Sequence, residues 1–334
     1  MAVFMNKILK IKRQLKTPDQ LEAKKQVNKI IIGILLFELI MTAGVLLDAI
    51  IQIIRVAVVS MNHPDLEQQV DAALMECLNS GRATIISLTA GIIFLFFFFR
   101  KQDFSKKLFD KKQPMKASAF FFILTLFMST QLVFLAASVG GESLFNMFGY
   151  SIMAEIESAT NTSTVFSMFL YASFIGPIAE ELVFRGFVMR GLARFGKITA
   201  ILCSALLFGA FHGNLIQGVF AVTAGMVLGY VAMEYSILWA IAIHVINNFI
   251  FGDLWAYVTG GFNETLQLIL FYGVYSSFFV GAVILLVLKR KEIRNYWNNN
   301  KNENGYYKII FTSLWFILFM ILHLALGISG IHKL

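Results

Sequence analysis

Residues 180–185 place three ionisable side chains inside an otherwise hydrophobic stretch. This stretch runs from about 165 to 188, and the six residues read Glu-Glu-Leu-Val-Phe-Arg. A charge at bilayer depth costs roughly 2.5–3.5 kcal/mol on insertion scales, so membrane segments rarely carry one without a use. Three charges within six residues make this stretch the first place to look for chemistry.

The two glutamates of this stretch face different neighbours on the predicted helix. Glu181 and Arg185 are four residues apart with the glutamate first, the favourable order for an ion pair on one face, so we interpret this pair as structural. Glu180 points about 100° away and has no local cation, which makes it the better candidate for a general base. Pro177 lacks an N–H and predicts a kink that frees backbone groups beside the site.

Two further apolar segments each carry a histidine. His212 follows Phe208 by one helical turn, so the phenylalanine would shield it from lipid on one side. His244 and Asn248 are also one turn apart, with Asn247 adjacent. A lone membrane histidine is often a structural hydrogen-bonding residue, and a His/Asn pair can brace neighbouring helices. Two such pairs near an unpaired glutamate nevertheless favour one shared site.

Together these residue types form a hydrolytic set. A carboxylate with a nearby imidazole can orient and deprotonate a water molecule. A second imidazole and a carboxamide can donate hydrogen bonds to the oxygen of a tetrahedral intermediate. Ser236 and Cys203 lack a nucleophile motif, although spacing alone excludes neither.

The three motifs resemble those of a known family. Glu180-Glu181-x-x-x-Arg185, Phe208-x-x-x-His212 and His244-x-x-x-Asn248 occur in the order found in the CAAX protease and bacteriocin-processing (CPBP, or Abi) family of intramembrane peptidases, which includes type II CAAX prenyl endopeptidases. The resemblance covers about 164–252. It implies that Glu180 activates water with help from His212, that His244 and Asn248 are oxyanion donors or metal ligands, and that Glu181 and Arg185 are a supporting pair.

The residues leave the cofactor open. Glu180, His212 and His244 could offer three ligands to a divalent metal such as zinc and leave a fourth position for water. Against a metal, the sequence has no His-Glu-x-x-His helix, and no carboxylates are apparent that would orient the histidines as ligands. The resemblance points toward metallopeptidases, whereas the residues slightly favour a mechanism without metal.

Composition predicts an all-α, polytopic membrane protein. The chain is 58% hydrophobic and 14% charged, with 34 phenylalanines among 334 residues and a mean hydropathy of +0.72. About 20 apolar residues cross a bilayer as a helix. Eight or nine spans are predicted, near 30–54, 83–99, 117–138, 164–184, 198–212, 216–234, 237–252, 265–288 and 308–329.

Lysine and arginine sort the loops by side. They concentrate in 1–29, 100–116 and 289–308, whereas 56–81 and 140–163 contain acidic residues and neither lysine nor arginine. The positive-inside rule therefore predicts a cytoplasmic N-terminus. The net charge of +8 reflects this loop bias together with attraction to anionic membrane lipid, and it requires no nucleic-acid partner.

We therefore expect four regions and one membrane-bound activity. The regions are a basic cytoplasmic segment at 1–29, accessory helices at 30–163, a catalytic four-helix core at 164–252 and C-terminal helices at 253–334. The expected activity is endopeptidase cleavage of a lipidated or membrane-associated peptide or protein, in a cavity reached from the cytoplasm of a bacterial cell. Two rivals are a proton-coupled transporter, which an inverted repeat would favour, and a non-catalytic immunity or scaffold protein.

One expectation about depth conflicts with a shared site. Counted from Lys197, His212 lies about 22 Å along its helix, whereas Glu180 is placed nearer the cytoplasmic end by the predicted span boundary at 184. The two residues meet only if 186–196 form an interfacial or re-entrant stretch, or if the helix leading to His212 is tilted.

Overall fold

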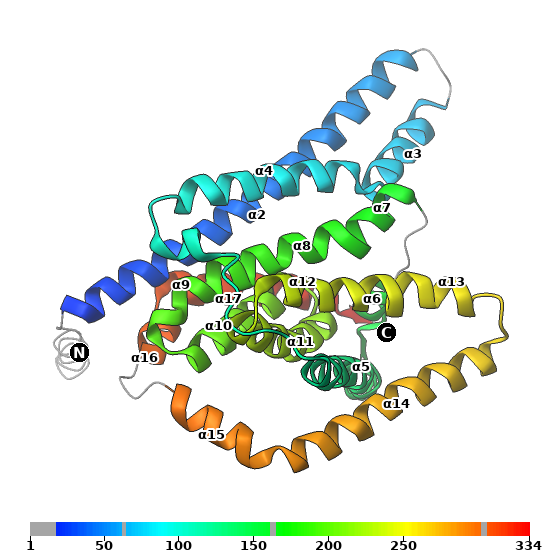
Figure 1. Ribbon diagram of the computed structural model, residues 1–334. Helices are drawn as coiled ribbons and strands as arrows, with labels where there is room; N and C mark the ends of the chain where they lie inside the picture. Colours follow the sequence, from blue (N-terminus) through cyan, green and yellow to red (C-terminus); the bar gives the residue numbers. More distant parts are fainter. Residues whose placement is uncertain (1–17, 62–64, 161–164, 302–305) are drawn as a thin grey trace.

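The computed structural model describes residues 18–61, 65–160, 165–301 and 306–334, and it is helical through almost all of them (Figure 1). The basic residues Lys7, Lys10, Lys12, Arg13 and Lys16 of the N-terminal segment lie outside the described residues. The helix expected from residue 30 begins earlier, at Pro18, so the rest of that segment forms its first turns. Ala23 and Val27 are buried there, which explains the early start.

The elements follow one another with short connections. In chain order they are α2 (Pro18–Val59), α3 (Leu66–Asn79), α4 (Gly81–Phe99), η1 (Asp103–Lys107), α5 (Ala117–Asn146), β1 (Tyr150–Ser151), α6 (Met153–Thr160), α7 (Phe166–Leu170), η2 (Tyr171–Ile175), α8 (Gly176–Glu181), η3 (Leu182–Met189), α9 (Arg190–Leu192), η4 (Ala193–Phe195), α10 (Lys197–Phe211), α11 (Leu215–Glu234), α12 (Ile237–Val245), η5 (Ile246–Leu254), α13 (Trp255–Thr259), α14 (Glu264–Leu288), α15 (Arg290–Asn300), α16 (Tyr306–Phe311), α17 (Leu314–Ser329) and β2 (His332–Lys333). The two short strands pair antiparallel and join the C-terminus to the turn after α5.

The predicted all-α membrane architecture is confirmed. Within the described residues, seven helices are long and apolar enough to cross a bilayer, and two shorter apolar helices, Lys197–Phe211 and Leu314–Ser329, accompany them. Each of these nine segments overlaps one of the nine expected ones, with ends that differ by up to about ten residues. The chain is therefore an integral membrane protein, whereas its division into accessory and catalytic regions stays a prediction.

The span that carries the two glutamates is longer than expected. It continues without interruption from Phe166 to Phe195, so residues 186–195 are helix and not a re-entrant stretch. Gly196 then turns the chain into α10 with φ of +109°, a conformation that glycine adopts without steric cost. Glu180 and His212 each lie sixteen residues from Gly196 (180 to 196 and 196 to 212), so the helical hairpin brings them to the same depth. The expected conflict came from ending this span at 184.

The middle of the bundle is formed by α10, α11 and α12, with α8 on one side and α5 and α14 on the other (Figure 1). Small residues allow α10 and α11 to pack closely, because a Cβ added at Gly209 would lie 2.7 Å from the carbonyl oxygen of Gly218. The C-terminal helix α17 contacts both α10 and α2. Helices that are distant in the sequence thus enclose α10 and α11.

Loop charge separates the two ends of the bundle. The basic connections around α9 and α15 lie at the same end as the start of α2, and the acidic elements α3 and α6 lie at the opposite end together with α13 (Figure 1). This separation is the pattern on which the positive-inside rule acts. The cytoplasmic position of the basic end stays a prediction.

A second intramembrane pair joins the N-terminal and C-terminal helices. Nε2 of His323 on α17 lies 3.0 Å from Oε1 of Glu38 on α2, and both side chains are largely buried. The Nδ1 of His323 bonds the carbonyl of Phe319, 2.8 Å away. Since a carbonyl only accepts, Nδ1 carries a hydrogen, and a proton shared between Nε2 and the carboxylate completes the contact.

We expect His323→Phe to destabilise the protein, because it leaves the Glu38 carboxylate buried without its partner. Breaking a buried pair costs about 3–5 kcal/mol, whereas replacing both partners by apolar groups of similar size is often neutral. The double variant Glu38→Met/His323→Phe should therefore recover most of the lost stability. Thermal unfolding of the purified variants in detergent measures both effects, and an unchanged melting temperature for His323→Phe would contradict the pairing.

Candidate active site

The helix before the glutamates leaves its α-helical hydrogen-bond register at η2, a π-helical turn. The N–H of Gly176 bonds the carbonyl of Tyr171 instead of that of Ala172. Pro177 has no N–H and offers none to Ala172 either. The freed Ala172 carbonyl accepts a hydrogen bond from Nδ2 of Asn248, 2.9 Å away. The freed backbone group expected beside Pro177 is thus present, and it creates the attachment point for one of the predicted site residues, whereas the kink stays a prediction.

Glu181 and Arg185 form the predicted ion pair. Both side chains are fully buried, and Nε of the arginine lies 3.2 Å from Oε2 of the glutamate. The guanidinium also stacks over the ring of Phe208, 4.3 Å from its centroid, and donates to the carbonyl of Gly225 at 3.4 Å. A Cβ at Gly225 would lie 3.1 Å from this guanidinium, so glycine lets the α11 backbone approach. The pair therefore connects its own helix to α10 and α11.

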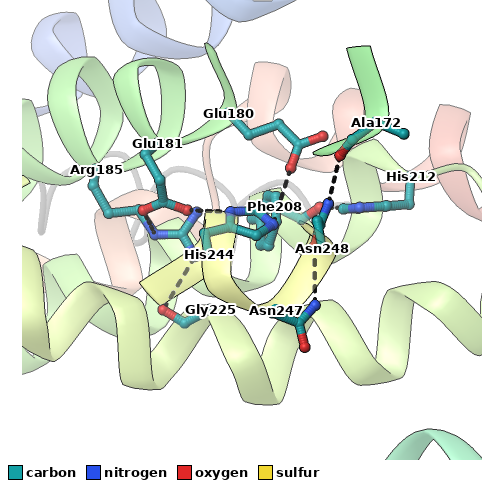
Figure 2. Close-up of polar contacts among 10 residues, drawn as sticks. All are labelled: Ala172, Glu180, Glu181, Arg185, Phe208, His212, Gly225, His244, Asn247 and Asn248. Atoms are coloured by element: carbon teal, nitrogen blue, oxygen red, sulfur yellow. Dashed lines mark hydrogen bonds and ion pairs between the residues drawn. The ribbon is translucent and has the colours of Figure 1, made fainter. Parts of the chain in front are cut away.

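His244 lies between the two glutamates (Figure 2). Its Nδ1 is 3.0 Å from Oε1 of Glu181, and its Nε2 is 3.8 Å from Oε2 of Glu180. Carboxylates only accept hydrogen bonds, so both sides of the ring face acceptors. This ring joins the buried ion pair to the more exposed glutamate and ties α12 to α8.

Phe208 lies in the last turn of α10, and His212 is the residue that caps its C-terminus. Nδ1 of His212 bonds the carbonyl of Phe208 at 2.8 Å, so this nitrogen carries a hydrogen and Nε2 of the neutral ring is free to accept. The ring of Phe208 packs edge-on against His212 and His244, with centroids 4.9 and 6.1 Å away. Phe208 is 2% exposed and holds the two histidines and Arg185 apart by its ring.

A chain of amides continues from Asn248 across to α5. Nδ2 of Asn247 donates to Oδ1 of Asn248 at 2.9 Å, and Nε2 of Gln131 donates to Oδ1 of Asn247 at 2.8 Å. Each carboxamide satisfies the next one. Because the second N–H of Asn248 has no protein acceptor among the described residues, it is available to another group.

A cavity of about 700 Å³ brings several of these side chains to one wall. Its lining includes Glu180, His212, Asn247 and Asn248, whereas Glu181, Arg185 and His244 lie behind this wall. Glu180 is the exposed member of the glutamate pair, with 22% of its side chain accessible. The structure therefore brings the base candidate, one histidine and the carboxamide to a common space.

The lining of the cavity bears on the side from which it is reached. Its lining continues to Ser158 and Thr160 of α6 and to Ala256 of α13, the elements at the acidic end of the bundle (Figure 1). Among the described residues the lining includes none from the basic end, so a cytoplasmic position for the basic loops favours an entrance from the opposite side of the membrane.

Glu180, His212 and His244, the three residues that could have bound a metal, do not form a metal site. Among the residues that the structure describes, no three His, Cys, Asp or Glu side chains form a group that could hold an ion. Both ring nitrogens of His244 face the glutamates, and Nδ1 of His212 is bonded to a carbonyl, which leaves only Glu180 and one nitrogen of His212 open. A catalytic zinc needs three protein ligands. In this arrangement Glu180, His212 and His244 do not fit a zinc site.

Sequence reasoning missed several polar residues of the cavity, of which Gln131 and Asp253 take part in its hydrogen bonds. Gln131 lies in the middle of α5 and reaches the wall through the amide chain. Asp253 also lines the cavity and accepts a hydrogen bond from the buried Ser173, 2.5 Å away. The available signal for Asp253 was an acidic residue directly after the apolar run ending at 252.

Residues 162–250 match the family model described as "Type II CAAX prenyl endopeptidase Rce1-like". The matched segment contains all three motifs and covers about a quarter of the chain, and it confirms the family resemblance found in the sequence. No curated protein and no solved structure matches the chain. The family match supports a membrane-embedded peptidase in general terms.

We expect Arg185→Ala to reduce the amount of folded protein, because it leaves the fully buried carboxylate of Glu181 without its cation. The loss should be about 3–5 kcal/mol. Adding Glu181→Gln should restore part of it, since the amide is neutral and can still bond His244. Yield after extraction and melting temperature in detergent check both variants. Normal stability of Arg185→Ala combined with loss of hydrolysis would instead assign Arg185 to the catalytic set.

Proposed function

We propose that the protein is an intramembrane endopeptidase that hydrolyses a peptide bond with a water molecule activated by Glu180 and His212. The observation that carries this proposal is the common cavity wall. It holds a carboxylate, an imidazole with a free nitrogen and a carboxamide, within the segment that matches the prenyl endopeptidase family.

Glu180 is the proposed general base. Its carboxylate reaches the cavity, and its own helix supplies no cation, because Arg185 is committed to Glu181. As water attacks the carbonyl carbon, Glu180 takes one proton. It then returns that proton to the leaving amine, so that the carboxylate is regenerated. General acid–base work of this kind contributes about 10²–10⁴-fold to rate.

His212 assists by fixing the water. The bond from its Nδ1 to the Phe208 carbonyl directs Nε2 as an acceptor, and the cavity is the space that the side chain faces. A water held between this nitrogen and the Glu180 carboxylate has both hydrogens directed to acceptors. Its lone pairs are then free for the substrate carbonyl.

Asn248 is the proposed donor to the developing oxyanion. One of its amide hydrogens is used by the Ala172 carbonyl, which fixes the plane of the group and leaves the second N–H for the cavity. A positioned donor of this type is worth about 10²–10³-fold in kcat. His244 lies behind the wall, so we assign it a positioning role toward Glu180 in place of direct oxyanion contact.

The proposed substrate is a peptide or lipidated protein segment at the membrane, and the proposed location is a bacterial cell membrane. A cavity within the bilayer-spanning helices is reached by a chain that already lies at or in the lipid. Its volume of about 700 Å³ is typical of sites that enclose a small ligand or a few peptide residues.

We expect Glu180→Gln to abolish hydrolysis while the protein stays inserted and folded. The amide keeps the shape and the hydrogen bonding of the carboxylate, but it cannot take a proton, so turnover should fall by about 10²–10⁴-fold. Cleavage of a peptide mixture by purified protein in liposomes, read by mass spectrometry, measures the effect.

The matched control is Glu67→Gln, which makes the same change at an exposed position of α3 and should leave turnover intact. Wild-type turnover by Glu180→Gln would refute the assignment of the base. Absence of cleavage by wild-type protein, together with solute uptake by vesicles, would favour the transporter reading. Absence of both activities would favour a scaffold.

For the cofactor, we expect hydrolysis to survive washing of the active protein with a chelator, because His244 is held between the two glutamates and only Glu180 and one nitrogen of His212 stay open, fewer than the three protein ligands of a catalytic zinc. Elemental analysis before and after washing, alongside turnover, checks this expectation. One tightly held zinc per chain, with activity lost on stripping and regained when zinc is returned, would show that the metal-free mechanism is wrong.

A further inference from the structure

The cavity carries negative charge that the proposed chemistry does not use. Its lining contains the carboxylates of Glu180 and Asp253 and includes neither lysine nor arginine. The nearest arginine of the motif, Arg185, is fully buried behind the wall and paired with Glu181. The cavity therefore provides a second anionic group with no internal counter-charge.

Asp253 is held in a defined position. The hydroxyl of Ser173, which is completely buried, donates to its Oδ2 at 2.5 Å. No lysine or arginine of the described residues forms an ion pair with this carboxylate, and its second oxygen is left for the cavity. Asp253 is partly buried, and a carboxylate partly removed from water without a cation is stabilised by a cationic ligand.

The distance from the proposed chemistry follows from the helix that carries Ser173. Ser173 and Glu180 are seven residues apart, which is two turns, or about 10 Å along the axis. An extended peptide advances about 3.3–3.6 Å per residue. Asp253 is bonded to Ser173 and therefore lies about 10 Å from Glu180 along the helix axis, toward the acidic end of the bundle. An extended substrate would cover that distance with about three residues.

The entrance has the same sign of charge as Asp253. The lining reaches Ser158, Ala159 and Thr160 of α6, a helix whose exposed charged residue is Glu157, and the lining itself includes neither lysine nor arginine. A site lined by one sign of charge raises the local concentration of ligands of the opposite sign. The entrance and the interior therefore favour the same kind of ligand.

We propose that Asp253 is a specificity residue that selects a lysine or arginine side chain of the substrate, two to four residues from the scissile bond. This inference rests on the proposed endopeptidase function. The substrate would enter from the end of the bundle that carries α6 and α13, so a basic segment reaches Asp253 before the peptide bond reaches Glu180. Ser173 acts through Asp253 as a positioning residue.

The test uses purified full-length protein in liposomes and a mixture of short peptides with every residue type at each position. Mass spectrometry of the products gives the residues that surround each cleaved bond. For wild-type protein we expect enrichment of lysine and arginine at one position two to four residues from that bond. A charge-assisted hydrogen bond of this kind corresponds to about 10–100-fold in kcat/KM relative to glutamine at the same position.

Variants then separate specificity from structure. Asp253→Asn keeps the shape and the bond to Ser173, and it should remove the preference by raising KM for basic peptides much more than for neutral ones. Asp253→Glu should keep the preference, and Asp253→Lys should reverse it toward acidic residues. Glu264→Gln, which removes an exposed charge at the same end but outside the cavity lining, should have no effect.

Each outcome decides the proposal. Equal losses on neutral and basic peptides, or a preference that survives in Asp253→Asn, would overturn the role of Asp253 while the endopeptidase function stands. Absence of all cleavage by wild-type protein would instead remove the endopeptidase function. In that case, binding of a lysine-containing fluorescent peptide, compared with its glutamine counterpart, still reports on Asp253. Equal binding of the two peptides would overturn the inference.

Discussion

The carboxylate of Glu181 has to be neutralised in a low-dielectric interior, and the two groups that contact it hold the site together. Arg185 approaches from the next turn of the same helix, and His244 approaches from α12. An unpaired charge at this depth would cost several kcal/mol, so α8 and α12 are held to one relative position. The same imidazole contacts Glu180, and the position of the cavity-facing carboxylate therefore depends on a pair that never reaches the cavity.

A second constraint comes from the backbone. In a bilayer, a carbonyl without a donor is costly, and irregular helix is tolerated only where protein groups replace the missing bonds. Pro177 and the π-helical turn before it free the carbonyl of Ala172, and Asn248 takes it. Asn247 and Gln131 continue the same chain. The three carboxamides thus form a hydrogen-bonded chain that ends on the carbonyl freed by the helix irregularity, which gives a reason for their presence at bilayer depth.

The depth of Glu180 and His212 in the bundle is set by the turn at Gly196 between their two helices. Because Glu180 and His212 lie equally far from this turn, two antiparallel helices suffice to bring base and imidazole together. The flanking helices add a pair of their own, Glu38 with His323, which joins α2 and α17 outside the segment that matches the family. The lining of the cavity extends toward the acidic end of the bundle. A ligand that approaches from that end therefore meets the same negative charge that distinguishes these loops from the basic ones.

The sequence alone determined the membrane class, the nine apolar segments and the different environments of Glu180 and Glu181. These properties depend on hydropathy and on helical periodicity, which are local. It also indicated the Pro177 effect, because a missing N–H is a covalent property. The depth of Glu180 was predicted wrongly because the charges at 185 and 190 suggested that the span ends at 184. Arg185 is instead paired inside the protein, and the span continues to Phe195.

Contacts across the bundle required the tertiary structure. His244 could have faced a cavity or a helix, and only the packing of α12 on α8 places both its nitrogens against carboxylates. Asp253 follows an apolar run and resembles a loop residue until the π-helical stretch of η5 carries it onto the cavity wall beside Ser173. Local patterns identify which side chains are costly to bury. Which of them meet is decided by how the helices pack, because their partners are 40 to 285 residues away in the sequence.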